Sequence, residues 1–215
     1  METLFHPDSK FIRVLTKISE GIMLSLLWFF FSLPVITAGA STTALYYTVN
    51  KSLFHSSGYV WQEFWGAFKS NFKQSTIAWL LALLFYVVSI FDFFILYSLT
   101  STNGNWNFII FIIMLALVTF WVCYIFPCIA RFENSTRLIM RNALIIAFCN
   151  LPKTILLCIL LILSLAITLT YLPLIAVTPA IYMYLARWIL ERVFKKYTSP
   201  EDLAAEEERN QSYER

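Results

Sequence analysis

Charge is the property that this sequence has least of. Lysine, arginine, aspartate and glutamate together make up 13% of the 215 residues, against about 25% in ordinary soluble domains. The scarcity is uneven, because residues 154–186 contain no charged side chain and residues 74–130 contain only Asp92. Stretches this long and this apolar exclude a soluble domain and predict an integral membrane protein.

Glycine and histidine are too few and too scattered to build the common catalytic or cofactor sites. The five glycines form neither a phosphate-binding loop nor a dinucleotide fingerprint. His6 and His55 have no carboxylate or cysteine at ligand spacing, and the four cysteines contain no Cys-x-x-Cys pair. We therefore expect no enzyme activity, no cofactor and no metal site, and we interpret the cysteines as small buried packing residues.

What the sequence does contain is a series of long apolar segments. A hydrocarbon core about 30 Å thick needs about 20 residues per helical crossing, and the candidate segments cover residues 22–38, 77–99, 106–127, 154–172 and 173–190. They lack the alternation that marks the strands of a barrel. The expected fold is all-α, with a single polytopic helical membrane domain over residues 1–198 and an acidic, disordered cytosolic tail over residues 199–215.

Lysine and arginine predict the orientation, because they concentrate in cytoplasmic loops. Basic residues lie between the first two segments, between the third and fourth, and after the fifth, whereas the connections at residues 101–105 and 171–172 have none. This pattern places the C-terminus in the cytoplasm. Five crossings would put the N-terminal bases Lys10, Arg13 and Lys17 outside, so we expect a re-entrant or sixth segment that returns the N-terminus to the cytoplasm. Five and six crossings both stay open.

The expected position of that reversal is a helix break at Pro34 or Gly39. A weak internal similarity supports the break, because LPVI at residues 33–36 and LPLI at residues 172–175 are each followed by threonine, tyrosine and then a base. The second copy adds Pro173 and Pro179 as candidate breaks. A competing interpretation is a signal peptide cleaved near residues 38–40, but the apolar run continues through Val49, which favours a retained segment.

An aromatic stripe predicts an amphipathic helix between the first two segments. Its members recur at helical spacing and are Trp61, Phe64, Trp65, Phe68 and Phe72. We interpret it as a helix lying on the inner leaflet. The sharper alternative is a partner-binding surface, which would consist of Trp61, Trp65, Lys69, Lys73, Arg131, Arg137 and Arg141.

Asp92 is the one ionisable side chain within an expected span, where insertion of a carboxylate costs about 2.5 to 3.5 kcal/mol. It is a candidate intramembrane polar site. A role in proton or cation coupling would require Asp92 to face the interior of the bundle. Its place near the outer end of its segment also allows simple contact with water.

Several motifs resemble those of the YesL-like bacterial membrane proteins, a family classed as a domain of unknown function. They are Trp28, the stretch SLPVITAG at residues 32–39, ALY at residues 44–46, FKSNFK at residues 68–73, and LP at residues 172–173 with TPA at residues 178–180. Ala40 departs from the pattern, since members often have proline there. The resemblance implies a small multi-pass protein of the cell membrane, encoded beside sugar-uptake ABC transporters and sensor kinases in Gram-positive bacteria.

Two classes of function follow from these observations. The first is a non-enzymatic accessory or regulatory component linked to carbohydrate uptake, with the lipid bilayer and sugar ABC-transporter subunits or a sensor kinase as partners. The second is a small-solute transporter or channel in its own right, with Asp92 as a coupling group. Nucleic acid is not an expected partner, because the bases bracket apolar segments and do not form one basic face.

Overall fold

The computed structural model describes residues 10–54, 58–99, 104–198 and 200–201, and in these ranges the chain is helical without a strand. The expected all-α class is confirmed. The seven α-helices are α1 (Lys10–Ser32), α2 (Ala38–Thr48), α3 (Val60–Leu99), α4 (Gly104–Arg131), α5 (Thr136–Cys149), α6 (Leu151–Thr170) and α7 (Thr178–Phe194). Two 3₁₀ turns, η1 (Val35–Thr37) and η3 (Leu172–Ala176), and one π-helical turn, η2 (Val49–Phe54), complete the path. The expected acidic tail lies almost wholly outside the described residues.

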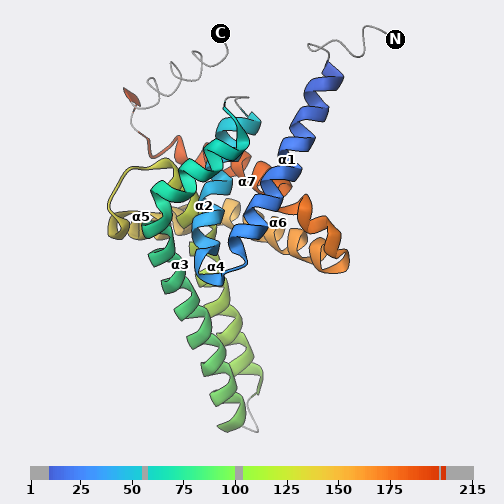
Figure 1. Cartoon of the computed structure of the whole chain (residues 1–215). Helices are drawn as coiled ribbons and strands as arrows, with labels where there is room; N and C mark the ends of the chain where they lie inside the picture. Colours follow the sequence, from blue (N-terminus) through green and yellow to red (C-terminus); the bar gives the residue numbers. More distant parts are fainter. Residues whose placement is uncertain (1–9, 55–57, 100–103, 199, 202–215) are drawn as a thin grey trace.

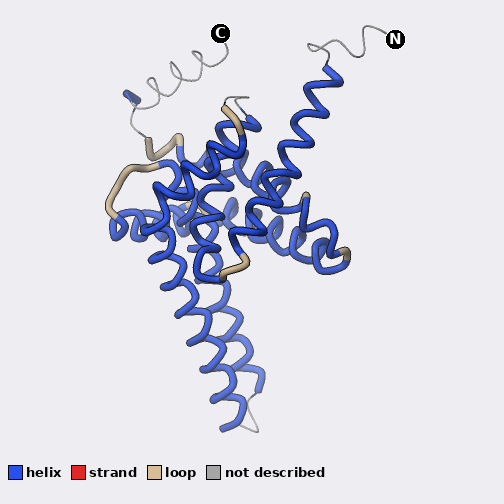
Figure 2. Tube along the Cα trace, viewed as in Figure 1, coloured by secondary structure: helices blue, strands red, loops and turns tan. Residues whose placement is uncertain are grey.

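The helices form two hairpins around a long antiparallel pair (Figure 1). α3 and α4 make the pair, and their far ends extend well beyond the other helices at the foot of the view. α1 and α2 form one hairpin beside the upper half of α3, while α6, η3 and α7 form the second, which projects to the right. Short loops join these elements, as the tube in Figure 2 shows.

Four helices of the described chain are long and apolar enough to cross a membrane: Val14–Ser32, Val60–Ile95, Phe108–Arg131 and Leu151–Thr170. They account for four of the five expected segments and support a multi-pass membrane protein. The fifth, at residues 173–190, becomes the turn η3 and the 17-residue helix α7. α7 does not meet the same length and composition criteria, and it carries Arg187, Glu191 and Arg192 near its end.

The amphipathic stretch expected on the inner leaflet is not a separate element. It forms the first part of α3, which runs for 40 residues without a break. Phe64 and Phe68 are buried, and their rings lie 5.7 and 5.0 Å from that of Phe31 in α1. Much of the stripe therefore packs on protein, which hydropathy alone does not distinguish from packing on lipid.

The break at Pro34 is present and turns the chain back on itself. α1 ends at Ser32, and the Thr37 hydroxyl lies 2.6 Å from the carbonyl oxygen of Phe31 and 2.8 Å from that of Pro34. The Trp79 indole of α3 donates a 2.6 Å hydrogen bond to the carbonyl oxygen of Val35. These bonds satisfy backbone groups that the proline turn exposes.

Pro173 makes the second break, inside η3. The hydroxyls of Thr168 and Thr178 join the two sides of this turn at 2.7 Å. Gly39 and Pro179, by contrast, lie in the first turns of α2 and α7 and break neither helix. Proline is tolerated at that position because the first backbone N–H groups of a helix have no intrahelical acceptor.

Gly39 has a different role, because it lets α2 approach α3 very closely. A Cβ atom at Gly39 would lie 2.6 Å from the Cβ of Trp79 and 2.7 Å from the backbone oxygen of Ser75. Four residues further along α2, the hydroxyl of Thr43 meets that of Ser75 at 2.8 Å. Small residues at such crossings permit the close backbone packing that joins helices within membranes.

Helix α5 was not expected, since its sequence falls in the loop between the third and fourth segments. Its buried residues are Ile139, Ala143, Ile146 and Ala147. This is the i, i+4, i+7, i+8 spacing of an amphipathic helix. The pattern was present in the sequence, but it is short and interrupted by polar residues.

Gly39→Ala should strongly destabilise the fold, because the added methyl group meets backbone and Cβ atoms that cannot move aside. Overpacking of this kind costs about 1 to 3 kcal/mol or more. The matched control is Gly66→Ala, since nothing lies within 4 Å of a Cβ there, and alanine should add about 0.5 to 1 kcal/mol of helix stability. Thermal unfolding of both variants in mild detergent checks this, and equal unfolding midpoints would refute the close contact.

Candidate functional site

A buried charged cluster lies where α2, α4 and α7 meet. Glu191 of α7 accepts hydrogen bonds from Arg131 of α4 and, at 2.8 Å, from the hydroxyl of Tyr46 in α2. The side chains of Arg131 and Glu191 are 9% and 13% exposed, so this ion pair is largely shielded from solvent. One carboxylate thus ties three helices together.

Tyr46 acts as a donor in this cluster. Burial, and after it the charge of Glu191, raises the pKa of the Tyr46 hydroxyl well above its ordinary value. The hydroxyl therefore stays protonated at neutral pH and donates to the carboxylate. The Arg131 guanidinium also lies 5.9 Å from the ring centroid of Phe194, at the end of α7.

Arg187 forms the second half of the cluster, one helical turn before Glu191. Its Nε donates to the side-chain oxygen of Asn50, and its guanidinium carbon lies 3.3 Å from the ring centroid of Phe54. Asn50 and Phe54 both belong to η2, whose π-helical winding places them on the side facing α7. π-helical turns occur frequently at functional sites.

An ion pair at the edge of the cluster joins η2 to α3. Lys51 and Glu63 meet at 2.9 Å, and both side chains are partly exposed. Burial works to lower the pKa of Lys51, but the hydrogen bond to Glu63 and the nearby Tyr47 raise it above the ordinary value overall. Lys51 is therefore fully charged at neutral pH.

We name these residues the junction cluster: Tyr46, Asn50, Phe54, Arg131, Arg187 and Glu191. It contains two guanidinium groups and one carboxylate, so it places charged groups inside the protein. Burying charge is costly unless the groups are paired and hydrogen-bonded. The sequence alone did not predict that Tyr46, Arg131 and Arg187 lie around one carboxylate. The available signal was Glu191, a carboxylate four residues after an arginine at the end of an apolar helix.

The predicted partner surface is only partly assembled. Trp61 and Trp65 stack with ring centroids 6.2 Å apart, and the Lys69 ammonium lies 4.7 Å from the Trp65 ring centroid. Trp61 is 48% exposed, so this stack is open to a partner. Lys73 follows it along α3 and is also exposed.

The three arginines of the predicted surface divide into two groups. Arg137 and Arg141 are exposed on α5, and the loop before α5 is joined to α3 by a 3.0 Å hydrogen bond from Gln74 to the carbonyl oxygen of Asn134. Arg131 instead belongs to the junction cluster and does not contribute to the open surface. The reason is Glu191, whose position relative to Arg131 depends on tertiary packing.

Asp92 lies on the part of α3 that projects with α4 beyond the other helices (Figure 1). Its side chain is exposed. The structure therefore does not bring it to the junction cluster or to the helix interfaces. The orientation required for a coupling role, facing the interior of the bundle, is not the one observed.

Comparison with known proteins finds a similarity to one family model over part of the chain. A family model described as "Protein of unknown function, DUF624" matches residues 22–93. No curated protein and no solved structure matches the chain. The matched residues run from α1 into α3 and include the Pro34 turn, the contact at Gly39 and the 3.1 Å hydrogen bond from the Trp28 indole to Thr42.

Removing Glu191 should destabilise the protein more than removing Arg131 and Glu191 together. Glu191→Leu leaves the buried Arg131 guanidinium without the Glu191 carboxylate, which should lower the free energy of unfolding by about 3 to 5 kcal/mol. The double variant Arg131→Met with Glu191→Leu removes both charges and should recover much of that loss. Unfolding midpoints of the single and double variants measure the difference.

The control for this cycle is the partly exposed Lys51–Glu63 pair. Removing Lys51 should cost at most about 1 kcal/mol, because solvent screens such pairs. Two results would contradict the structural role of the junction cluster. One is an equal loss of stability from removing Lys51 and from Glu191→Leu, and the other is a double variant less stable than Glu191→Leu.

Proposed function

We propose that this protein is a YesL-like multi-pass protein of the cell membrane that acts as a non-enzymatic accessory or regulatory component in carbohydrate uptake. The match to a family model over residues 22–93 is consistent with that family. The link to carbohydrate comes from the resemblance of the sequence motifs. The partners it implies are subunits of a sugar ABC transporter or a sensor kinase.

The observation that carries a docking role is the exposed stack of Trp61, Trp65 and Lys69. Tryptophan dominates the energetics of protein interfaces when a partner buries it. The three residues follow one stripe of α3 at four-residue spacing, where side chains adjoin one another. The stacked rings are held in place before binding, which lowers the entropy cost of forming an interface.

The positions of the basic residues support a cytoplasmic location for this stack. The first turns of α1 and α3 lie at the same end of the molecule (Figure 1), because the Pro34 hairpin reverses the chain. In this arrangement Lys10 and Lys17 lie at the same end as Lys51 and Lys69, which supports a cytoplasmic N-terminus. By the positive-inside rule this end faces the cytoplasm, with both termini.

The transporter alternative draws less support from the structure. It relied on Asp92 as a coupling group, and that side chain is exposed on the projecting α3–α4 pair. Among the described residues, the Glu191 carboxylate and the Arg131 and Arg187 guanidinium groups are shielded from solvent and belong to the junction cluster, which ties helices to one another.

Weakening the Trp61 stack should abolish partner association without unfolding the protein. The variant is Trp61→Ala with Lys69→Glu, compared after crosslinking in the native membrane, affinity isolation and mass spectrometry. Sugar-transporter subunits or a sensor kinase should be recovered with the wild-type protein and lost, by about tenfold or more, with the variant.

The control for that experiment is Trp106→Ala on α4. Trp106 is 68% exposed and lies on the projecting α3–α4 pair, away from the stack. This variant should retain the partner. Loss of the partner from both variants, or recovery of the protein alone from wild-type membranes, would count against the docking role.

Asp92→Asn separates the two functional classes. The accessory role predicts unchanged partner recovery and unchanged solute uptake, because the exposed carboxylate contributes to neither. A transporter coupled through Asp92 would instead lose uptake while remaining folded and inserted. Uptake by cells that express either form, with protein level in the membrane as the reference, decides between them.

A further inference from the structure

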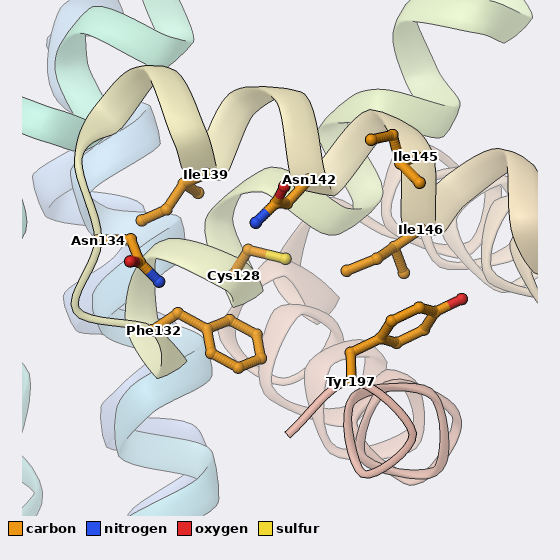
Figure 3. A pocket seen from close by; sticks show the side chains of 8 residues that line it. All are labelled: Cys128, Phe132, Asn134, Ile139, Asn142, Ile145, Ile146 and Tyr197. Carbon is orange, nitrogen blue, oxygen red and sulfur yellow. The ribbon is translucent and has the colours of Figure 1, made fainter. Parts of the chain in front are cut away.

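A cavity of about 260 Å³ lies between the end of α4, one face of α5 and the chain that follows α7. It is separate from the exposed tryptophan stack and from the residues of the junction cluster. Figure 3 shows its lining side chains, which come from residues 128–146 and, from much further along the chain, Tyr197. A site built from several elements can be specific for the shape of a small molecule.

The walls of the cavity are apolar and well supported. Ile139, Ile145 and Ile146 line it from α5. Phe132 lies opposite them and is held by an edge-to-face contact with Phe194 at 5.6 Å. Tyr197 contributes its ring, because its hydroxyl points away from the cavity in Figure 3 and accepts a 3.0 Å hydrogen bond from Asn150.

Polar groups lie at one side of this space. The carboxamides of Asn134 and Asn142 and the thiol of Cys128 all line the cavity, and the Asn142 amide lies directly above Cys128 in Figure 3. Each carboxamide offers two N–H donors and one acceptor oxygen. None of the lining side chains that the structure describes carries a formal charge at neutral pH, so the cavity favours a neutral ligand over an ion.

The volume limits the size of the ligand. A cavity of about 150 Å³ is large enough to hold benzene. At about 260 Å³, this one has room for a six-membered ring and a polar substituent, with the ring against Ile145 and Ile146 and the substituent beside the asparagines.

We propose that this cavity binds a small neutral molecule that consists of one ring and a hydroxyl or carbonyl group. Binding would bridge α4, α5 and the segment after α7. The inference does not depend on the docking role, because it involves different residues and a different kind of ligand.

A photoreactive benzyl alcohol that carries a trifluoromethyl diazirine tests the proposal directly. It is neutral and presents one ring and one hydroxyl. The purified full-length protein in detergent micelles is irradiated with increasing amounts of this probe, and the labelled residues are identified by peptide mass spectrometry. The expected adducts lie on Cys128, Phe132, Tyr197 or α5, saturate with concentration and are displaced by excess benzyl alcohol.

Two neighbouring residues of α5 provide a matched pair of variants. Ile145 and Leu144 are 46% and 45% exposed, but only Ile145 lines the cavity. Ile145→Trp should fill the space and reduce saturable labelling about tenfold, whereas Leu144→Trp should leave it unchanged. Asn142→Leu, which keeps a branched side chain but removes the carboxamide, should also weaken labelling and serves if Ile145→Trp does not fold.

The proposal would be overturned if labelling increased with probe concentration without saturating and if the labelled residues lay only on the exposed apolar surfaces of α3, α4 and α6. That result would show the probe partitioning into the detergent. Equal saturable labelling in Ile145→Trp, Asn142→Leu and the wild-type protein would also overturn it, because the probe would then occupy another site.

Discussion

The contact of α2 with α3 at Gly39 is the constraint on which the rest of the structure depends. α2 has only 11 residues, of which eight are buried, and it packs against α1, α3, α4 and α7. Its threonines bond back to the carbonyl oxygens four residues earlier, as Thr43 does to Gly39 at 3.1 Å, so their hydroxyls are satisfied inside the bundle. A side chain at position 39 would force α2 away from Trp79 and move every helix that packs on it.

The junction cluster depends on that placement. Tyr46 is one turn from the end of α2 and reaches Glu191 only because α2 returns at this depth beside α3. η2 then continues directly from α2 and brings Asn50 to Arg187. The proline turn, the glycine contact and the charged cluster are therefore consecutive parts of one structural unit. The family model covers the first two parts and three residues of the cluster, Tyr46, Asn50 and Phe54, but neither Arg131 of α4 nor the two residues that α7 supplies.

The sequence predicts the features that hydropathy and backbone chemistry control. Long uncharged runs predicted the spans, because lipid tolerates few alternatives to a helix, and Pro34 and Pro173 predicted the turns. The sequence did not predict that the aromatic stripe of α3 continues into a span, that α5 is a helix, or that Arg131 meets Glu191. Each of these depends on which protein surface lies opposite. Apolar side chains that face lipid and those that face another helix have the same composition, so a single sequence does not separate them.

The distribution of charge and polarity explains why the candidate sites lie at one end of the molecule. The projecting halves of α3 and α4 are apolar and are exposed on the faces that do not pack on one another, with Asp92 as the one charged side chain described there. A surface of this kind suits lipid and offers little chemistry for recognition. The tryptophan stack, the junction cluster and the cavity all lie toward the other end, where α5 and the turns widen the molecule beyond the α3–α4 pair (Figure 1). The molecule therefore separates an apolar end that suits lipid from an end that carries the polar and charged side chains suited to partners and small ligands.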